Sequence, residues 1–114
     1  MNASSQDAPA TPVIDGCDTP AKLLRARAAS WGATAAIRHK RFGIWQSLTW
    51  TDYFERVRSI GLALAARGLR RGDVVGVLAE NRPEWLIADL GAQCMGMIGM
   101  GVYPTSSPEQ LAYV

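Results

Sequence analysis

Residues 74–103, VVGVLAENRPEWLIADLGAQCMGMIGMGVY, contain the pattern that decides the fold. Val74–Leu78 is an unbroken apolar run rich in β-branched residues, too short for a helix and without the alternation of a half-exposed strand. It predicts a central strand that is covered on both faces. A second apolar segment, Ile98–Tyr103, predicts the next strand. With a helix between them, the two strands predict a βαβ unit in which they are parallel and the crossover is right-handed.

The segment Asn81-Arg82-Pro83-Glu84 predicts where the connecting helix begins. Asn81 is a favourable N-cap, Pro83 lies in the first turn, where its missing amide costs no hydrogen bond, and Glu84 follows at the third position. We expect this helix to run to about Met95 and to end at Gly96. The segment Ser107-Pro108-Glu109-Gln110 repeats the capping pattern and predicts the start of a further helix.

A helix and a β-hairpin are predicted before this unit. Thr19-Pro20 predicts an N-cap followed by Pro at the first position of a short helix, which ends near Trp31. Residues 35–38 and 44–48 predict two strands around a turn at residues 39–43, whose glycine can adopt a positive φ.

A longer helix is predicted directly after the hairpin. Thr49 and Asp52 form a capping box at its start, and Gly68 is a typical left-handed terminator after Arg67. Apolar residues recur at spacings of four, three and four, so one face of this helix should pack on a core. That face consists of Tyr53, Val57, Ile60 and Leu64.

Length and composition indicate one α/β domain: a parallel βαβ unit with a preceding helix and β-hairpin. The chain has 114 residues, of which 48% are hydrophobic and 19% charged, as in globular proteins. Residues 1–20 contain few large apolar side chains, and we expect them to form a flexible N-terminal tail. Residues 21–114 then form the domain, which stops inside a helix.

We expect neither a membrane span nor a signal peptide in this sequence. The longest apolar candidate, Leu86–Val102, is interrupted by Asp89 and Gln93. The first 18 residues have no Lys or Arg and no continuous apolar run. Two isolated cysteines, Cys17 and Cys94, predict reduced thiols, and we expect a cytoplasmic protein.

Charge is distributed unevenly along the chain. Residues 1–20 carry 0 basic and 3 acidic groups, residues 21–71 carry 11 and 2, and residues 72–114 carry 1 and 5, giving −3, +9 and −4. Two interpretations stay open for the basic middle segment. It provides either solvated helix faces and a turn, or a surface for an anionic partner such as a phosphate-rich ligand, a nucleic acid or a lipid surface.

Two motifs resemble phosphate-binding loops but lack essential features of them. Gly96, Gly99 and Gly101 have the spacing G-x-x-G-x-G and lead into a strand, whereas a dinucleotide loop has G-x-G-x-x-G between a strand and a helix. We interpret these glycines as places where a helix packs closely on a strand. Thr105-Ser106-Ser107 is followed by neither Lys nor Gly, so we interpret it as helix capping.

Isolated reactive side chains do not form a catalytic constellation. His39 lies among Arg38, Lys40 and Arg41, which disfavour both a protonated ring and a bound metal. Cys94 has no neighbouring base and is interpreted as a small core residue. The basic turn at 38–41, flanked by aromatic residues, is a candidate contact for RNA or lipid headgroups. We therefore predict no catalytic, cofactor-binding or metal-binding residue.

Several segments together resemble a known enzyme family. They are Leu48–Trp50, Leu69–Val77, Asn81–Trp85 and Gly101–Thr105, in an order and with separations natural to that family. Over about residues 20–114 the chain resembles the N-terminal part of the adenylate-forming synthetases, and within them the long-chain fatty acyl-CoA synthetases. The resemblance implies a fragment of an enzyme that uses ATP and magnesium to form an acyl-adenylate and then transfers the acyl group to coenzyme A.

The resemblance carries no catalytic residue onto this chain. The family's phosphate loop, its Tyr-Gly-x-Thr-Glu segment, its ribose-binding Asp and its C-terminal Lys have no counterpart in the sequence. We expect the chain alone to be inactive, with the C-terminal remainder as its partner and a fatty acid as substrate of the complete enzyme. Nucleic acid is not an expected partner, whereas peripheral membrane contact stays open. The alternatives are a non-catalytic module that binds an anionic surface or a protein, and adenylation of another carboxylate.

Overall fold

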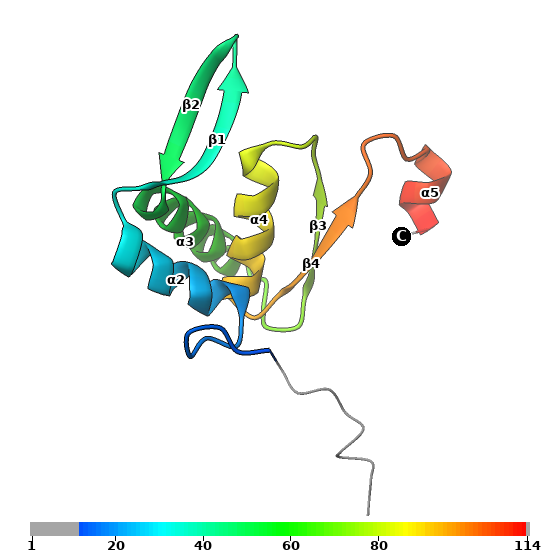
Figure 1. The fold of residues 1–114 in the computed structure, drawn as a ribbon. Helices are drawn as coiled ribbons and strands as arrows, with labels where there is room; N and C mark the ends of the chain where they lie inside the picture. The colour runs from blue at the N-terminus through cyan, green and yellow to red at the C-terminus, as the bar shows by residue number, and fades with distance from the viewer. Residues whose placement is uncertain (1–11, 114) are drawn as a thin grey trace, which may run out of the picture.

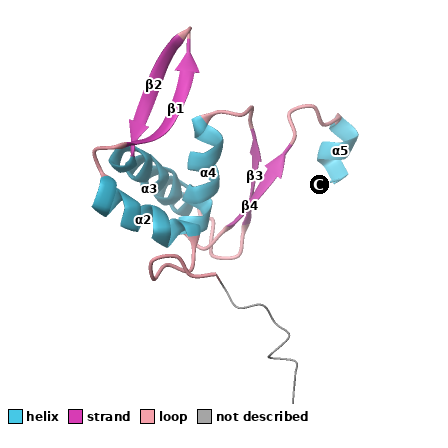
Figure 2. Cartoon of the chain, viewed as in Figure 1, coloured by secondary structure: helices cyan, strands magenta, loops and turns pink. Residues whose placement is uncertain are grey.

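The computed structural model describes residues 12–113, which form an α/β arrangement with helices grouped beside two small sheets (Figures 1 and 2). Helices α2, α3 and α4 pack together, the β1–β2 hairpin projects from one end of this group, and β3 and β4 lie beside α4. The predicted fold class is confirmed. The elements are α2 (Pro20–Trp31), β1 (Ala35–Arg41), β2 (Ile44–Thr49), α3 (Trp50–Ala66), β3 (Val74–Leu78), α4 (Pro83–Cys94), β4 (Ile98–Val102) and α5 (Pro108–Tyr113).

The βαβ unit has the predicted parallel strands. β3 pairs with β4 in register from Val74 opposite Ile98 to Leu78 opposite Val102, with α4 as the connection. The pairing begins at a tight junction, where the Gly72 amide donates to the Gly96 carbonyl at 2.9 Å. The right-handed crossover stays a prediction.

β3 is covered on one face only, so the predicted burial of both faces is wrong. Val74 and Leu78 are 56% and 55% exposed, whereas Val77 is buried against the helical side. An apolar run shows that both faces of a strand are suited to burial, but it cannot show that the same chain supplies both layers. Among the described residues only α4 packs on this sheet.

Helix α4 begins one residue later than an Asn81 cap would require. Its N-cap is Arg82, which has an extended conformation and no side-chain capping hydrogen bond. The reason is Pro83, because proline at the first helical position forces the residue directly before it into the β region. Asn81 therefore lies outside the helix, and its predicted capping role is wrong. Thr19 precedes Pro20 directly and does cap α2, accepting from the Lys22 amide at 3.1 Å.

The other helix termini follow their predicted chemistry. The Asp52 amide donates to Thr49 Oγ1 at 3.1 Å and the Thr49 amide to Asp52 Oδ2 at 3.4 Å, which completes the capping box of α3. Gly68 has a φ of 93° after the C-cap of α3. Ser107 and Gln110 exchange the same reciprocal pair of bonds at the start of α5. These caps satisfy amides that would otherwise lack partners.

The hairpin turn is shorter than predicted. β1 extends to Arg41 and β2 begins at Ile44, so residues 39–41 belong to the strand and only Phe42 and Gly43 form the turn. Both turn residues have positive φ, 51° and 76°, as a two-residue turn between twisted strands requires. Glycine indicated the turn but not how closely the strands approach it, and in an exposed strand Lys40 and Arg41 keep their charged groups in water.

Residues before α2 are only partly described. Residues 1–11 of the predicted tail lie outside the described residues. Beyond them, Ile14 and Cys17 form a backbone bridge around a turn, and Asp15 pairs with Arg27 of α2 at 2.5 Å. The division of the chain near residue 20 stays a prediction.

In the core, α3 and α4 approach each other closely at two glycines. A Cβ on Gly61 would lie 2.9 Å from the Gly91 carbonyl oxygen, and one on Gly91 would lie 2.8 Å from Ile60 Cγ2. On the predicted face of α3, Tyr53 and Val57 are buried, while Ile60 at this crossing is 38% exposed. The core cluster consists of Leu24, Leu48, Tyr53, Val57 and Ile87.

The cap assignment predicts different effects for two similar substitutions. Thr49→Ala should lower the free energy of unfolding by about 1 kcal/mol, because it removes a side-chain cap. Asn81→Ala should change it by less than about 0.5 kcal/mol, because Asn81 caps no amide. Urea denaturation of the full chain measures both values. Equal losses would contradict the cap assignment.

The glycine crossing predicts that Gly61→Ala destabilises the chain even though alanine is the better helix former. Displacing a backbone contact should cost about 1–3 kcal/mol, which outweighs a gain in helix propensity of about 1 kcal/mol. Arg58→Ala, on the exposed side of the same helix, is the control and should change stability by less than about 0.5 kcal/mol. Thermal or urea unfolding would disprove the close crossing if Gly61→Ala were stabilising.

Candidate functional site

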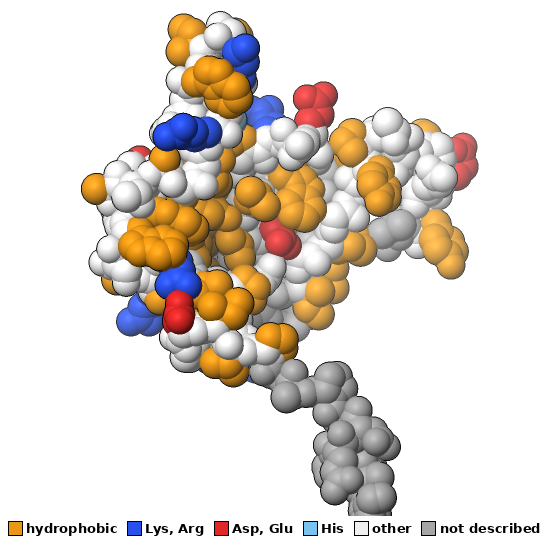
Figure 3. Space-filling model, viewed as in Figure 1, with side chains coloured by type: hydrophobic (Ala, Val, Ile, Leu, Met, Phe, Trp, Pro, Cys, Tyr) orange, Lys and Arg blue, Asp and Glu red, His pale blue; other side chains and the backbone are white. Residues whose placement is uncertain are grey.

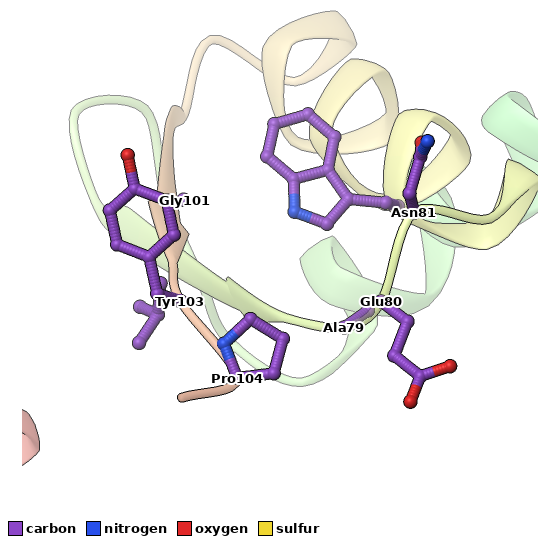
Figure 4. A pocket seen from close by; sticks show the side chains of 8 residues that line it. Ala79, Glu80, Asn81, Gly101, Tyr103 and Pro104 are labelled. Atoms are coloured by element: carbon purple, nitrogen blue, oxygen red, sulfur yellow. The ribbon is translucent and has the colours of Figure 1, made fainter. Parts of the chain in front are cut away.

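A hollow of about 370 Å³ opens where the carboxyl ends of β3 and β4 meet the start of α4 (Figure 4). In open α/β sheets, ligands bind at this edge of the parallel strands. Tyr103 and Pro104 stand opposite Asn81 across the hollow, and the Glu80 side chain extends away from them (Figure 4). The residues that line it are Ala79, Glu80, Asn81, Trp85, Gly101, Val102, Tyr103 and Pro104.

The hollow depends on a close contact between α4 and β4. Trp85 lies in the first turn of α4, and a Cβ on Gly101 would lie only 3.1 Å from its Cζ2 atom. Gly99 has a similar role, because a Cβ there would overlap the Asp89 carboxylate. The predicted role of these glycines in helix-strand packing is confirmed. Gly96 instead forms a turn with a φ of 74°.

The walls of the hollow are mainly aromatic and apolar. Trp85 is half-buried, Tyr103 is exposed, and Glu80 is the one charged residue in the lining. Beside the hollow, the Arg82 guanidinium donates to Glu84 at 2.9 Å and holds the pKa of that carboxyl below its usual range. With no Lys or Arg in the lining, the hollow suits a planar or apolar group and has no means of neutralising a phosphate.

The reactive residues singled out in the sequence are not brought together. His39 and Lys40 lie on β1, whereas Cys94 ends α4, where partial burial raises the pKa of its thiol. Both Cys17 and Cys94 are free thiols. In the part of the chain that the structure describes, no three His, Cys, Asp or Glu residues are arranged to hold a metal ion.

The sequence reasoning did not select Trp85 and Tyr103. A signal was available, since Tyr103 directly follows β4 and Trp85 lies in the first helical turn after the loop that leaves β3. That both lie at the edge where ligands bind follows only from the parallel pairing. In the sequence, Trp85 stands out only as part of the family resemblance.

Comparison with known proteins identifies the family. A sequence model of the AMP-binding enzyme family matches residues 24–114. The chain belongs to the AMP-binding enzyme family. This confirms the resemblance to adenylate-forming enzymes over the N-terminal portion.

None of the helices in residues 12–113 is long and apolar enough to cross a membrane.

The chain is also similar in sequence to individual curated proteins. It is 45% identical over 69 residues to an uncharacterized protein of Mycobacterium tuberculosis, covering 60% of this chain and 39% of that protein. It is 37% identical over 84 residues to a long-chain-fatty-acid–CoA ligase of Bos taurus, covering 74% of this chain and 12% of the ligase. The chain thus spans only a fraction of the length of the relatives it matches.

The fold agrees with a solved structure of the same kind. The anthranilate CoA ligase AuaEII, in complex with anthranoyl-AMP, superimposes with a TM-score of 0.77 at 21% identity. The match covers 99% of this chain and 20% of the ligase. The elements described above are therefore a portion of the adenylate-forming fold.

Among the residues that the structure describes, Tyr53 has the largest shift in pKa. It is buried in the core between α3 and α4, and burial, together with the negative charge of Asp89, raises its pKa from 10.0 to about 12. The phenol is not part of the lining of the hollow and contributes to packing, with its ring centroid 6.4 Å from that of Trp50.

The raised pKa of Tyr53 predicts a loss of stability in alkali. As the pH rises, the Tyr53 phenol loses its proton in the unfolded chain before it does so in the folded chain. The free energy of unfolding should therefore fall between pH 10 and about pH 12. Tyr53→Phe should remove that part of the decline, whereas Tyr113→Phe, at an exposed residue, should retain it. Urea titrations across this pH range measure the difference. An identical decline in all three proteins would contradict the assignment.

Proposed function

We propose that this chain is the N-terminal part of a long-chain fatty acyl-CoA ligase. Such an enzyme joins a fatty carboxylate to the AMP portion of ATP, releases pyrophosphate, and then transfers the acyl group to the thiol of coenzyme A with release of AMP. The observation that carries the proposal is the 37% identity to the bovine ligase across three quarters of this chain. The C-terminal remainder would be the chain's functional partner.

The described residues do not fit a binding site for magnesium and ATP. The hollow has no basic side chain for a phosphate, and no metal-binding cluster occurs in residues 12–113. We therefore assign no catalytic, cofactor-binding or metal-binding role to these residues. Their contribution is to hold the βαβ unit and the aromatic edge of β3 and β4 in place. ATP, magnesium and coenzyme A belong to the complete enzyme.

We further propose a cytoplasmic enzyme that works beside a membrane. Long-chain fatty acids partition into bilayers, because each buried methylene contributes about 0.8 kcal/mol. A ligase for such substrates gains access to them by binding peripherally at the bilayer surface. The basic segment, residues 21–71 with 11 basic and 2 acidic groups, supports this location.

Two other functions are compatible with particular observations. The fold match to an anthranilate CoA ligase, with a TM-score of 0.77 over 99% of this chain, is compatible with a ligase for another carboxylate. The same basic segment is compatible with a non-catalytic module that binds an anionic partner. The sequence identity to the bovine long-chain-fatty-acid–CoA ligase makes the fatty-acid ligase the better-supported function.

Carboxylate-dependent exchange between pyrophosphate and ATP tests the proposal. The protein encoded by the whole reading frame that contains this chain should show exchange with palmitate and much less with anthranilate. The 114-residue chain by itself should show none, because none of its described residues stabilises the charge that develops during adenylation.

Three results would contradict the proposal. Exchange between pyrophosphate and ATP that depends on anthranilate in preference to palmitate would show that the enzyme adenylates another carboxylate. A reading frame that ends at Val114, with a chain inactive on every acid, would support the non-catalytic module. Exchange by the short chain, abolished by one substitution in it, would show that a catalytic residue lies here after all.

A further inference from the structure

The tip of the β1–β2 hairpin exposes three large apolar side chains. Phe42, Ile44 and Trp45 are 90%, 66% and 68% exposed, and the hairpin carries them away from the helices (Figures 1 and 3). None of the three belongs to the core cluster, and most of their surface is exposed, so their burial contributes little to the stability of the fold. A cluster of exposed apolar residues at the end of a projecting element is typical of a contact surface.

Basic side chains surround these apolar residues, and no acidic residue balances them. Arg38, Lys40 and Arg41 lie on β1, and the sequence has no Asp or Glu between Asp18 and Asp52. None of the three forms an ion pair with any residue in the range 12–113. The hairpin therefore presents three unneutralised positive charges to a partner.

Cations and rings are already in contact on both faces of the hairpin. Lys40 Nζ lies 5.7 Å from the ring centroid of Trp45, its partner across the strands. The Arg41 guanidinium lies 5.3 Å from the ring centroid of Phe42. Aromatic rings beside Lys and Arg are the combination that favours the boundary between acyl chains and headgroups.

The turn itself contains a residue that its backbone disfavours. Phe42 has a φ of 51°, a conformation in which Asn or Gly is preferred, and its ring packs on no core residue in return. Asn-Gly would form the same turn with less strain. A residue that violates its local preference without a gain inside the chain is characteristic of a functional surface.

We propose that the β1–β2 hairpin docks on an anionic lipid bilayer, with Phe42, Ile44 and Trp45 entering the interface and Arg38, Lys40 and Arg41 contacting the headgroups. The surface follows from exposure and charge and does not depend on ligase activity. A bilayer fits better than RNA, because Ile44 cannot stack on a base and the narrow tip offers no platform for successive bases.

Sedimentation with large vesicles tests the proposal on the full 114-residue chain. Vesicles of phosphatidylcholine with about one third phosphatidylglycerol should bind the chain at low salt, and pure phosphatidylcholine should bind it far less. The triple variant R38Q/K40Q/R41Q should weaken binding about 100-fold, since each cation near an anionic surface contributes about fivefold.

Phe42→Asn separates binding from folding. It should reduce vesicle binding by about tenfold or more, because it removes a ring from the interface. The unfolding midpoint should stay equal or rise, because Asn suits the turn better. A matched control, R25Q/R67Q/R70Q, removes the same number of exposed charges outside the hairpin and should retain most of the binding.

Each remaining outcome overturns the proposal. Equal losses in the two triple variants would show attraction by net charge alone. Binding that survives the hairpin variants but disappears in V74T/I98T would place the contact on the open face of β3 and β4. Binding of single-stranded RNA without binding of anionic vesicles would make the hairpin a nucleic-acid contact.

Discussion

The backbone contact between Gly61 and Gly91 is the constraint on which the rest of the structure depends. With no side chain at either position, α3 and α4 approach until the carbonyl of one helix lies against the other. The β-hairpin leads directly into α3, and β3 and β4 flank α4 in the chain. The crossing therefore fixes the position of the hairpin relative to the βαβ unit.

A second close approach shapes the candidate site. Because Gly101 and Gly99 present only backbone to α4, Trp85 and Asp89 can lie directly over β4. The consequence is an aromatic hollow at the carboxyl edge of the strands without a group that could neutralise a phosphate. The arrangement supports a scaffold within an AMP-binding enzyme, not a self-sufficient catalytic centre.

Two exposed apolar surfaces have different physical characters. The open face of β3 and β4 exposes Val74, Leu78 and Ile98, as a sheet face does when it is suited to a further layer. The hairpin tip combines apolar and basic side chains on a narrow projection (Figure 3). Burial in a protein core would leave its charges without partners, so the tip suits a wet, anionic interface better.

The sequence by itself determined the elements whose signals are local. The capping box at Thr49, the Thr19-Pro20 start and the left-handed Gly68 all depend on residues within one helical turn, so their patterns predicted them correctly. The predicted Asn81 cap is wrong at the same scale, because Pro83 forces Arg82 directly before it into an extended conformation, and this restriction overrides the preference of Asn for caps.

Only the tertiary structure decided what depends on distant contacts. The coverage of β3, the placement of Trp85 and Tyr103 in one hollow, and the exposure of Phe42 each depend on which elements pack together. An apolar residue has the same pattern in the sequence whether a second layer covers it or not. Burial is a property of the neighbours that the fold supplies, and the sequence pattern specifies only the residues that are suited to it.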